Sequence, residues 1–260
     1  MTQHPTDQPR IDQLWPEPMD SLGDDELIAD LAAPRGPWLR VNFVSSVDGA
    51  VTTTDADGKP VSGGLGDASD KRMFELLRRV SDVVMVGAGT VRSEGYGPMR
   101  VSEASASWRE RRGLPAHPVF AIVSGSLDLD PRSTIFTDAP VTPIVITTTR
   151  ATAEQLAAFD GLAEVIVAGS SDIDVPLALA GLHERGLLHV LNEGGPSLFG
   201  SLIAADAVDE LCLTLSARLE AGDAHRISHG PLEAPAHLAL TRVLKHESTL
   251  LLRYGRAATE

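Results

Sequence analysis

The sequence predicts an α/β fold, in which a central and mostly parallel sheet is flanked by helices and closed at one edge by antiparallel strands. Short runs of β-branched residues alternate with helical stretches through the middle of the chain, and this alternation is typical of parallel sheets covered by helices. The last three predicted strands, at 210–217, 238–246 and 249–255, have no helix between them. They predict an antiparallel meander at one edge of the sheet.

The N-terminal part of the chain differs from the rest. Residues 1 to about 20 are rich in Pro, Asp and Gln and have no hydrophobic period, which predicts a loosely held arm. The segment 24–33 predicts a short helix with acidic residues in its first turn, where they suit the helix dipole. We therefore divide the chain into an N-terminal arm with a short helix, 1–37, and one domain, 38–256.

The domain begins with a β-rich segment, 38–46, which predicts the first core strand. Apolar residues recur at helical spacing over 67–80 and predict the first core helix. Further strands are predicted at 82–87, 118–124, 143–148, 163–168 and 187–192, and further helices near 152–159, 175–185 and 196–205. The polar segment 100–116 is long for a connection, so it predicts either a lid or an extra helix.

Composition narrows the possible partners and compartments. The net charge is −14, whereas nucleic acids and anionic membranes bind clustered Lys and Arg, so the sequence predicts neither partner. No segment has the pattern of a signal peptide or a membrane span. The single cysteine, Cys212, excludes an internal disulfide and a cysteine-based zinc site, and it favours the cytoplasm. His225 and His229 have no evident third ligand, so we expect no metal site.

Two glycine-centred junctions carry the strongest functional signal. Val86-Gly-Ala-Gly-Thr90 follows one predicted strand, and Asn192-Glu-Gly-Gly-Pro-Ser197 follows another. Glycine lets a ligand approach the main chain, and the N-terminus of a following helix attracts an anion. The two junctions together predict a dinucleotide phosphate site, although a tight turn without a ligand has the same sequence.

Several motifs, in order and at matching spacings, resemble the pyrimidine reductase domain of riboflavin biosynthesis, which has a dihydrofolate-reductase-like fold. They are Val41-Asn-Phe-Val-Ser-Ser-Val-Asp-Gly-Ala50, Glu75-Leu-Leu-Arg78, the junction at 86–90 with Glu94, Asn192-Glu-Gly-Gly-Pro-Ser-Leu198 and Val208-Asp-Glu-Leu211. The resemblance implies an NADPH-dependent reductase of a ribosylaminouracil phosphate, of the 5-amino-6-(5-phosphoribosylamino)uracil type. Hydride would reach the sugar C1′ after ring opening to an imine. Nothing in the sequence resembles the deaminase that often accompanies such reductases.

The resemblance and the glycine junctions together give a set of expected site residues. The cofactor positions are Val44, Val86, Gly87, Gly89, Thr90, Glu94, Ser124, Gly194, Gly195, Pro196, Ser197, Leu198 and Phe199. The positions implied to hold the substrate are Ser62, Arg78, Arg100 and Glu193. Glu193 is also the candidate catalytic residue, as a hydrogen-bond acceptor or in proton transfer; capping the next helix is its alternative role. The resemblance further implies a homodimer, whose contact we expect along the uncovered edge of the strands after residue 208.

A few departures from the family fall mostly on the substrate side. Asn42 stands near a position that is often basic, Gly63-Gly64 replaces an expected aromatic residue, and Glu94 replaces an aspartate. A reductase of dihydrofolate or another pterin on the same fold is therefore a second hypothesis. A non-catalytic NADPH-binding protein is a third.

Two assignments stay open in the sequence. The proton donor is Glu193, Asp67 or a bound water, because nothing in the pattern separates them. The group that binds the 2′-phosphate of NADPH is equally open, with Ser124 and Arg92 as candidates.

Overall fold

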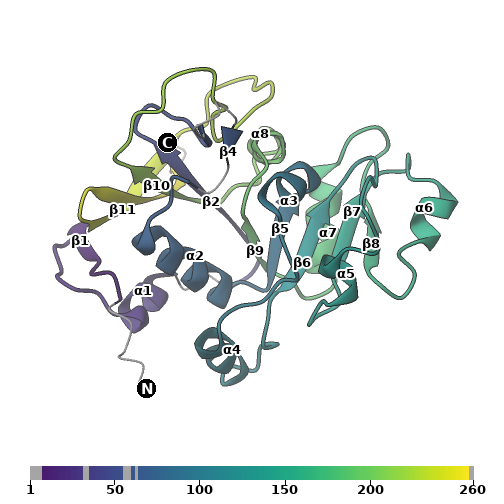
Figure 1. Ribbon diagram of the computed structural model, residues 1–260, viewed down its shortest axis with the longest axis horizontal. Helices are drawn as coiled ribbons and strands as arrows, with labels where there is room; N and C mark the ends of the chain where they lie inside the picture. The colour runs from purple at the N-terminus through teal and green to yellow at the C-terminus, as the bar shows by residue number, and fades with distance from the viewer. Residues whose placement is uncertain (1–7, 32–34, 55–59, 62–63, 258–260) are drawn as a thin grey trace.

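The computed structural model describes residues 8–31, 35–54, 60–61 and 64–257. In these residues the main sheet has ten strands, in the order β1-β11-β12-β10-β2-β9-β5-β6-β7-β8, and it runs across the whole molecule (Figure 1). The strands are β1 (Asp12–Trp15), β2 (Trp38–Ser46), β3 (Thr53–Thr54), β4 (Pro60–Val61), β5 (Val83–Gly87), β6 (Val119–Val123), β7 (Ile144–Thr147), β8 (Glu164–Val167), β9 (His189–Asn192), β10 (Glu210–Ser216), β11 (Leu238–His246) and β12 (Thr249–Arg256). The helices are α1 (Asp24–Leu31), α2 (Ala68–Val80), α3 (Ala88–Glu94), α4 (Glu103–Glu110), α5 (Thr134–Thr137), α6 (Ala153–Ala157), α7 (Val175–His183) and α8 (Pro196–Ala204).

The predicted fold class is confirmed. Neighbouring strands from β10 through β2, β9, β5, β6 and β7 to β8 pair in parallel, whereas β12, β11 and β1 pair antiparallel. The antiparallel part is not a simple meander, because β10 pairs with β12 instead of β11. The long connection 217–237 allows this exchange, since it carries the chain past the β12 position before β11 begins.

The prediction of a loosely held arm is wrong for the part of it that the structure describes. β1 pairs antiparallel with β11, and Asp12 lies opposite Lys245. Ile11 is fully buried in the core, and Arg72 on α2 donates to the Pro9 carbonyl. Tertiary pairing and one buried isoleucine order this segment, although its composition carries no strand signal.

Two hydrophobic layers cover the two faces of the sheet. Residues of α1, α2, α3, α5 and α6 contribute to one layer, and residues of α7 and α8 to the other. None of the helices in the described ranges combines the length and apolarity needed to traverse a lipid bilayer.

The segment between α3 and β6 contains an extra helix, α4, and not a lid. Its Arg109 is fully buried and donates to the carbonyl oxygens of Arg79 and Ser81 at the end of α2, at 3.1 and 2.5 Å. A guanidinium that satisfies the last carbonyls of a helix fixes where that helix ends. α4 therefore holds α2 in place from outside the sheet.

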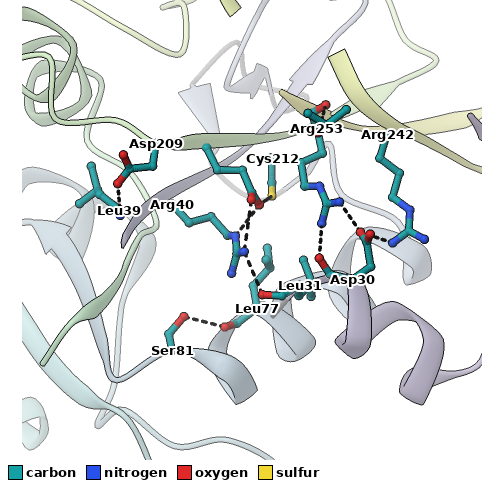
Figure 2. Close-up of polar contacts among 12 residues, drawn as sticks. Asp30, Leu31, Leu39, Arg40, Leu77, Ser81, Asp209, Cys212, Arg242 and Arg253 are labelled. Atoms are coloured by element: carbon teal, nitrogen blue, oxygen red, sulfur yellow. Dashed lines mark hydrogen bonds and ion pairs between the residues drawn. The ribbon is translucent and has the colours of Figure 1, made fainter. Parts of the chain in front are cut away.

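A cluster of buried and half-buried charges lies between α1 and the strands beneath it (Figure 2). Arg40 on β2 forms a two-pronged ion pair with Glu210 on β10, at 2.6 Å from Nε to Oε1 and 3.3 Å from Nη2 to Oε2. Asp30 on α1 pairs with both Arg242 and Arg253. These contacts tie α1 to β2, β10, β11 and β12.

Candidate functional site

The two glycine junctions lie side by side at the carboxyl ends of β5 and β9. These strands are neighbours, and the Gly87 N–H donates to the Gly194 carbonyl at 3.2 Å. An open cleft of about 930 Å³ lies over this edge of the sheet and is lined by both junctions. Ligands of open α/β sheets bind at such carboxyl edges. The predicted meeting of the two junctions is therefore present in the structure.

The second junction turns sharply into α8. Gly194 and Gly195 have φ angles of +123° and +99°, which side chains rarely adopt, so only glycine fits without strain. Pro196 occupies the first turn of α8, and Gly195 at the N-cap supplies no side chain to cap it. The first-turn N–H groups at Ser197 and Leu198 are therefore available to an anion.

Most of the expected cofactor residues line the cleft. They are Val44, Gly87, Gly89, Thr90, Glu94, Ser124, Gly194, Gly195, Pro196, Ser197 and Leu198. The side chains of Val86 and Phe199 instead lie in the core beneath it, where they are 0% and 3% exposed. Phe199 stacks on Phe43 with ring centroids 5.2 Å apart and so supports the cleft from below.

The structure brings only two of the four expected substrate residues together. Arg78 and Glu193 come together, as described below. Arg100 is exposed and pairs with Asp138 at 3.2 Å, away from the cleft lining. Ser62 lies outside the described residues.

Glu193 is held by an ion pair at the cleft. Arg78 on α2 donates from Nε and Nη2 to the two carboxylate oxygens of Glu193, at 2.6 Å each. The Tyr96 hydroxyl also donates to Oε2 at 3.2 Å. Both oxygens of Glu193 are thus occupied by side chains, so capping of the next helix, its alternative role in the sequence, is not observed.

The charges around Glu193 raise the pKa values of both side chains that bind it, Arg78 and Tyr96. Burial on its own would lower the pKa of Arg78, but the Glu193 carboxylate outweighs it and raises this pKa above its usual value. Burial and the same carboxylate raise the pKa of Tyr96, so its hydroxyl stays a neutral donor. The Arg78 guanidinium also lies 4.2 Å from the centre of the Phe74 ring.

Arg79, the neighbour of Arg78, points elsewhere. It donates to the Ser105 hydroxyl at 2.8 Å and pairs with Asp24 at 3.4 Å. Adjacent residues of a helix face directions about 100° apart, so the two arginines cannot share one role.

Asp67, one of the open candidates for the proton donor, is a helix cap. It accepts from the Ser69 and Asp70 backbone N–H groups at 2.8 and 3.0 Å, and from the Thr249 hydroxyl at 2.6 Å. Although burial alone would raise it, the hydrogen bonds from Ser69 and Thr249 hold the pKa of Asp67 below its usual value. It does not line the cleft.

Several residues of the cleft lining were not among the expected site residues, although Asn42 was noted as a departure on the substrate side. Asn42, Phe43, Asp70, Phe74 and Tyr96 line one end together with Glu193, and we call this the α2 end. Ser126, Arg150, Ser171, Asp172 and Ile173 line the other end together with Ser124, and we call this the β7 end.

A signal for the α2 end was present in the helical spacing. Asp70, Phe74 and Arg78 are four residues apart on α2, so they share one face of the helix. The apolar pattern predicts Phe74 in the core, but Asp70 and Phe74 line the cleft and Arg78 on the same face reaches Glu193.

The described residues contain no group of three or more His, Cys, Asp or Glu side chains arranged for a metal ion. His225 lines the cleft, whereas the backbone at His229 packs on α8 through a hydrogen bond from its N–H to the Pro196 carbonyl. Cys212 is buried on β10 beside Glu210.

Comparison with known proteins finds a matching family and several similar proteins. The model of the family described as RibD C-terminal domain matches residues 37–252. A 2,5-diamino-6-ribosylamino-4(3H)-pyrimidinone 5′-phosphate reductase of Archaeoglobus fulgidus is 30% identical over 178 residues, which cover 67% of this chain and 78% of the relative. A reductase of the same name from Methanothermobacter thermautotrophicus is 28% identical over 75% of this chain and 84% of its own. The crystal structure of a pyrimidine reductase-like protein from Corynebacterium diphtheriae superposes with a TM-score of 0.79 at 26% identity, covering 92% of this chain and all of that one.

Proposed function

Because the chain belongs to the RibD C-terminal domain family, we propose that it is an NADPH-dependent reductase of a ribosylaminopyrimidine phosphate in riboflavin biosynthesis. The relatives named above carry the name of such a reductase. The observation that carries the proposal is the single cleft formed where the glycine junctions of β5 and β9 meet.

The residues of the cleft fit a nicotinamide dinucleotide. The first turn of α8 offers uncapped N–H groups for the diphosphate, and the Thr90 hydroxyl lies beside the same turn. The β7 end supplies Arg150 and Ser124, which suit the additional 2′-phosphate that distinguishes NADPH from NADH. Arg92 is a weaker candidate for that phosphate, because its guanidinium already donates to the Asp128 carbonyl.

The α2 end is then left for the substrate. NADPH supplies the hydride, and the protein has to align the sugar C1′ with it and exclude water. Phe43 and Phe74 form apolar walls, while Arg78 and Tyr96 hold the Glu193 carboxylate in one orientation. Glu193 acts as a preoriented hydrogen-bond acceptor for the opened sugar.

The test is binding followed by turnover. Titration with NADPH, followed by fluorescence, should show saturable binding that is at least tenfold tighter than binding of NADH. Addition of 2,5-diamino-6-ribosylamino-4(3H)-pyrimidinone 5′-phosphate should then oxidise NADPH. Absence of saturable NADPH binding at millimolar concentration contradicts the proposal.

One observation favours a second candidate, a dihydropterin reductase. Arg100, which the family resemblance assigns to the substrate, pairs with Asp138 on the surface and does not reach the cleft lining. A substrate without a ribose phosphate has no need of such a residue. NADPH oxidation with 7,8-dihydrofolate, but not with the ribosylaminopyrimidine phosphate, would establish this second function.

The proposed enzyme is a cytoplasmic homodimer. β1 covers only the 243–245 part of the β11 edge, and Leu238 and Leu240 farther along β11 are 41% and 44% exposed. An incompletely covered strand with exposed leucines is a surface suited to a second copy. Light scattering on the purified enzyme should give twice the mass of one chain.

A further inference from the structure

His225 lines the cleft, but the proposed mechanism gives it no role and neither glycine junction contains it. It lies in the connection between β10 and β11, and Val51 and Thr52 from the turn after β2 line the cleft with it. Within the described ranges, its imidazole takes part in no hydrogen bond or ion pair. The ring is therefore available to a ligand in the cleft.

The turn after β2 holds this connection in place. β2 and β10 are parallel neighbours that end at the same level of the sheet. Beyond that end, the Asp48 carboxylate accepts from the backbone N–H groups of Glu220 and Ala221, at 3.2 and 2.8 Å. The Val51 N–H donates to the His225 carbonyl at 3.0 Å. The backbone of His225 is thus fixed by a hydrogen bond of its own.

The same connection packs directly on α8. The His229 N–H donates to the Pro196 carbonyl at 2.9 Å. A Cβ atom on Gly200 would lie 1.9 Å from the His229 carbonyl oxygen, so glycine at that position lets the connection lie against the helix. Four residues of chain span at most about 14 Å, so His225 lies close to the first turn of α8. That turn carries the uncapped N–H groups proposed to bind the diphosphate.

A diphosphate needs more positive charge than the N-terminus of α8 supplies. The end of a helix carries about half an elementary charge, whereas the diphosphate of a dinucleotide carries about two negative charges. Among the described residues, the arginines that line the cleft are Arg92 and Arg150. Arg92 donates to the Asp128 carbonyl, and Arg150 is proposed to bind the 2′-phosphate at the β7 end. In this part of the lining, His225 is therefore the basic side chain left for the diphosphate.

The strand order indicates which half of the cofactor lies near His225. β10 and β2 lie on one side of β9 and β5, whereas β6 and β7 lie on the other. The connection after β10 is therefore on the far side of the cleft from the β7 end. A cofactor with its adenosine at the β7 end directs its nicotinamide half toward β2 and β10, and hence toward His225.

We propose that His225 binds the phosphate on the nicotinamide side of the NADPH diphosphate through an imidazole N–H. The inference rests on the proposed function, because it takes NADPH as the cofactor and the β7 end as its adenosine site. An imidazole keeps at least one N–H donor in either protonation state, so the contact does not depend on the charge of the ring alone.

The experiment measures how much the nicotinamide half of the cofactor contributes to binding. Calorimetry gives the Kd of NADPH and the Kd of adenosine 2′,5′-bisphosphate, which lacks the nicotinamide half, and the ratio of the two affinities is the readout. The proteins are the wild type, His225→Ala, His225→Arg, His229→Ala and Arg150→Ala. His229 is exposed in the same connection and does not line the cleft, so the same substitution there is the matched control.

In His225→Ala the affinity for NADPH should fall about tenfold, because a hydrogen bond to a charged group is lost, while the affinity for the bisphosphate should stay within about twofold. Unchanged binding of the bisphosphate also shows that the variant is folded. Arginine restores N–H donors, so His225→Arg should bind NADPH within about threefold of the wild type. His229→Ala should match the wild type for both ligands.

Arg150→Ala should give a different pattern. Both ligands carry the 2′-phosphate, so both should bind more weakly and the affinity ratio should stay at the wild-type value. An unchanged ratio in His225→Ala overturns the inference. An equal fall of the ratio in His229→Ala also overturns it, because the effect then comes from the packing of the connection on α8 and not from the imidazole of His225.

The kinetic arm separates this inference from the proposed function. With the ribosylaminopyrimidine phosphate as substrate, KM for NADPH should rise about tenfold in His225→Ala with little change in kcat, since the contact lies away from the sugar C1′. If the affinity ratio falls but the wild type reduces no such phosphate, the proposed riboflavin function fails while the role of His225 stands. If the wild type reduces it and the ratio is unchanged, the reverse is true.

Discussion

Two ion pairs in this molecule have the same chemistry and similar burial but lie in different parts of the fold. Arg40 and Glu210 are 5% and 10% exposed and lie under α1, where Arg40 also donates to the Leu31 carbonyl and Glu210 lies beside the Cys212 thiol. Arg78 and Glu193 are 16% and 0% exposed, and Glu193 lines the cleft. Each is a two-pronged contact between a guanidinium and a carboxylate.

The difference shows that the contact alone does not reveal what a buried ion pair does. The first pair joins β2 to β10 and reaches back to the Leu31 carbonyl at the end of α1, so every partner is structural. The second pair holds a carboxylate at the carboxyl end of β9, beside the glycine turn that opens the cleft. Removal of the first should cost stability, and removal of the second should cost activity.

The largest effect is expected for Glu210→Gln. It leaves the Arg40 guanidinium without its counter-charge in a nearly dry environment, and breaking a buried pair in this way costs about 3–5 kcal/mol. Urea unfolding at pH 7 should show a loss of this size in the free energy of unfolding. Activity per folded molecule should stay at the wild-type level.

A double replacement sharpens the same point. Arg40→Met combined with Glu210→Leu removes both charges and fills the space with apolar atoms, so it should recover most of the stability lost in the single variant. A double variant as unstable as Glu210→Gln would contradict the electrostatic explanation. It would point instead to the loss of the Leu31 contact.

The next effect in size is expected for Glu193→Gln. The amide cannot accept from both Arg78 nitrogens, so the side chain loses its fixed orientation, and kcat/KM for the substrate should fall about 100-fold. Affinity for NADPH should be unchanged, because the proposed diphosphate site consists of backbone N–H groups in the first turn of α8 and of His225, none of which contacts Glu193. Glu210→Gln, the same substitution in the other pair, is the matched control and should keep its activity.

A Glu193→Gln enzyme with wild-type kcat/KM would remove Glu193 from the mechanism. The loss of stability in this variant should be smaller than in Glu210→Gln. The Arg78 side chain is 16% exposed, against 5% for Arg40, and its guanidinium keeps the contact with Phe74.

The smallest effect concerns Cys212, whose reactivity reports whether water reaches the Arg40–Glu210 pair. Burial, together with the Glu210 carboxylate, raises the pKa of the Cys212 thiol to about 12. An unfolded cysteine titrates near pH 8.5, so at pH 8 only the unfolded chain contains reactive thiolate. A thiol reagent at pH 8 should label the urea-unfolded protein completely and leave the native protein unlabelled for hours. Rapid labelling of the native protein would mean that water enters this cluster.

The backbone-made part of the site was predictable from sequence, and the part made by side chains was only partly so. The junctions at 86–90 and 192–197 are recognisable because glycine and proline have few other uses at the ends of strands. Their contact in space follows from two parallel strands that share one edge. The same logic gave the fold class and most elements.

The rest depended on tertiary contacts that local patterns do not contain. Asp70 and Tyr96 reach the cleft because α2 and the turn after α3 are packed in particular orientations, which α4 and Arg109 help to fix. Arg100 was a plausible ligand by its position after a turn, but the fold places Asp138 beside it. The arm acquires strand structure only because β11 offers it an edge.

Because β9 lies between β2 and β5, the sheet cannot be completed until β9 has been synthesised. β2 and β5 do not pair with each other, and both wait for His189–Asn192, which leave the ribosome more than a hundred residues after β5. Until then the nascent chain can pair only β5, β6, β7 and β8 of the main sheet, while β2 has no partner because β10 also follows β9 in the sequence, and completing the sheet requires contacts between segments far apart in sequence, which form slowly. A chain truncated before residue 189 would lack β9 and its glycine turn, and with them the cleft proposed to bind the coenzyme.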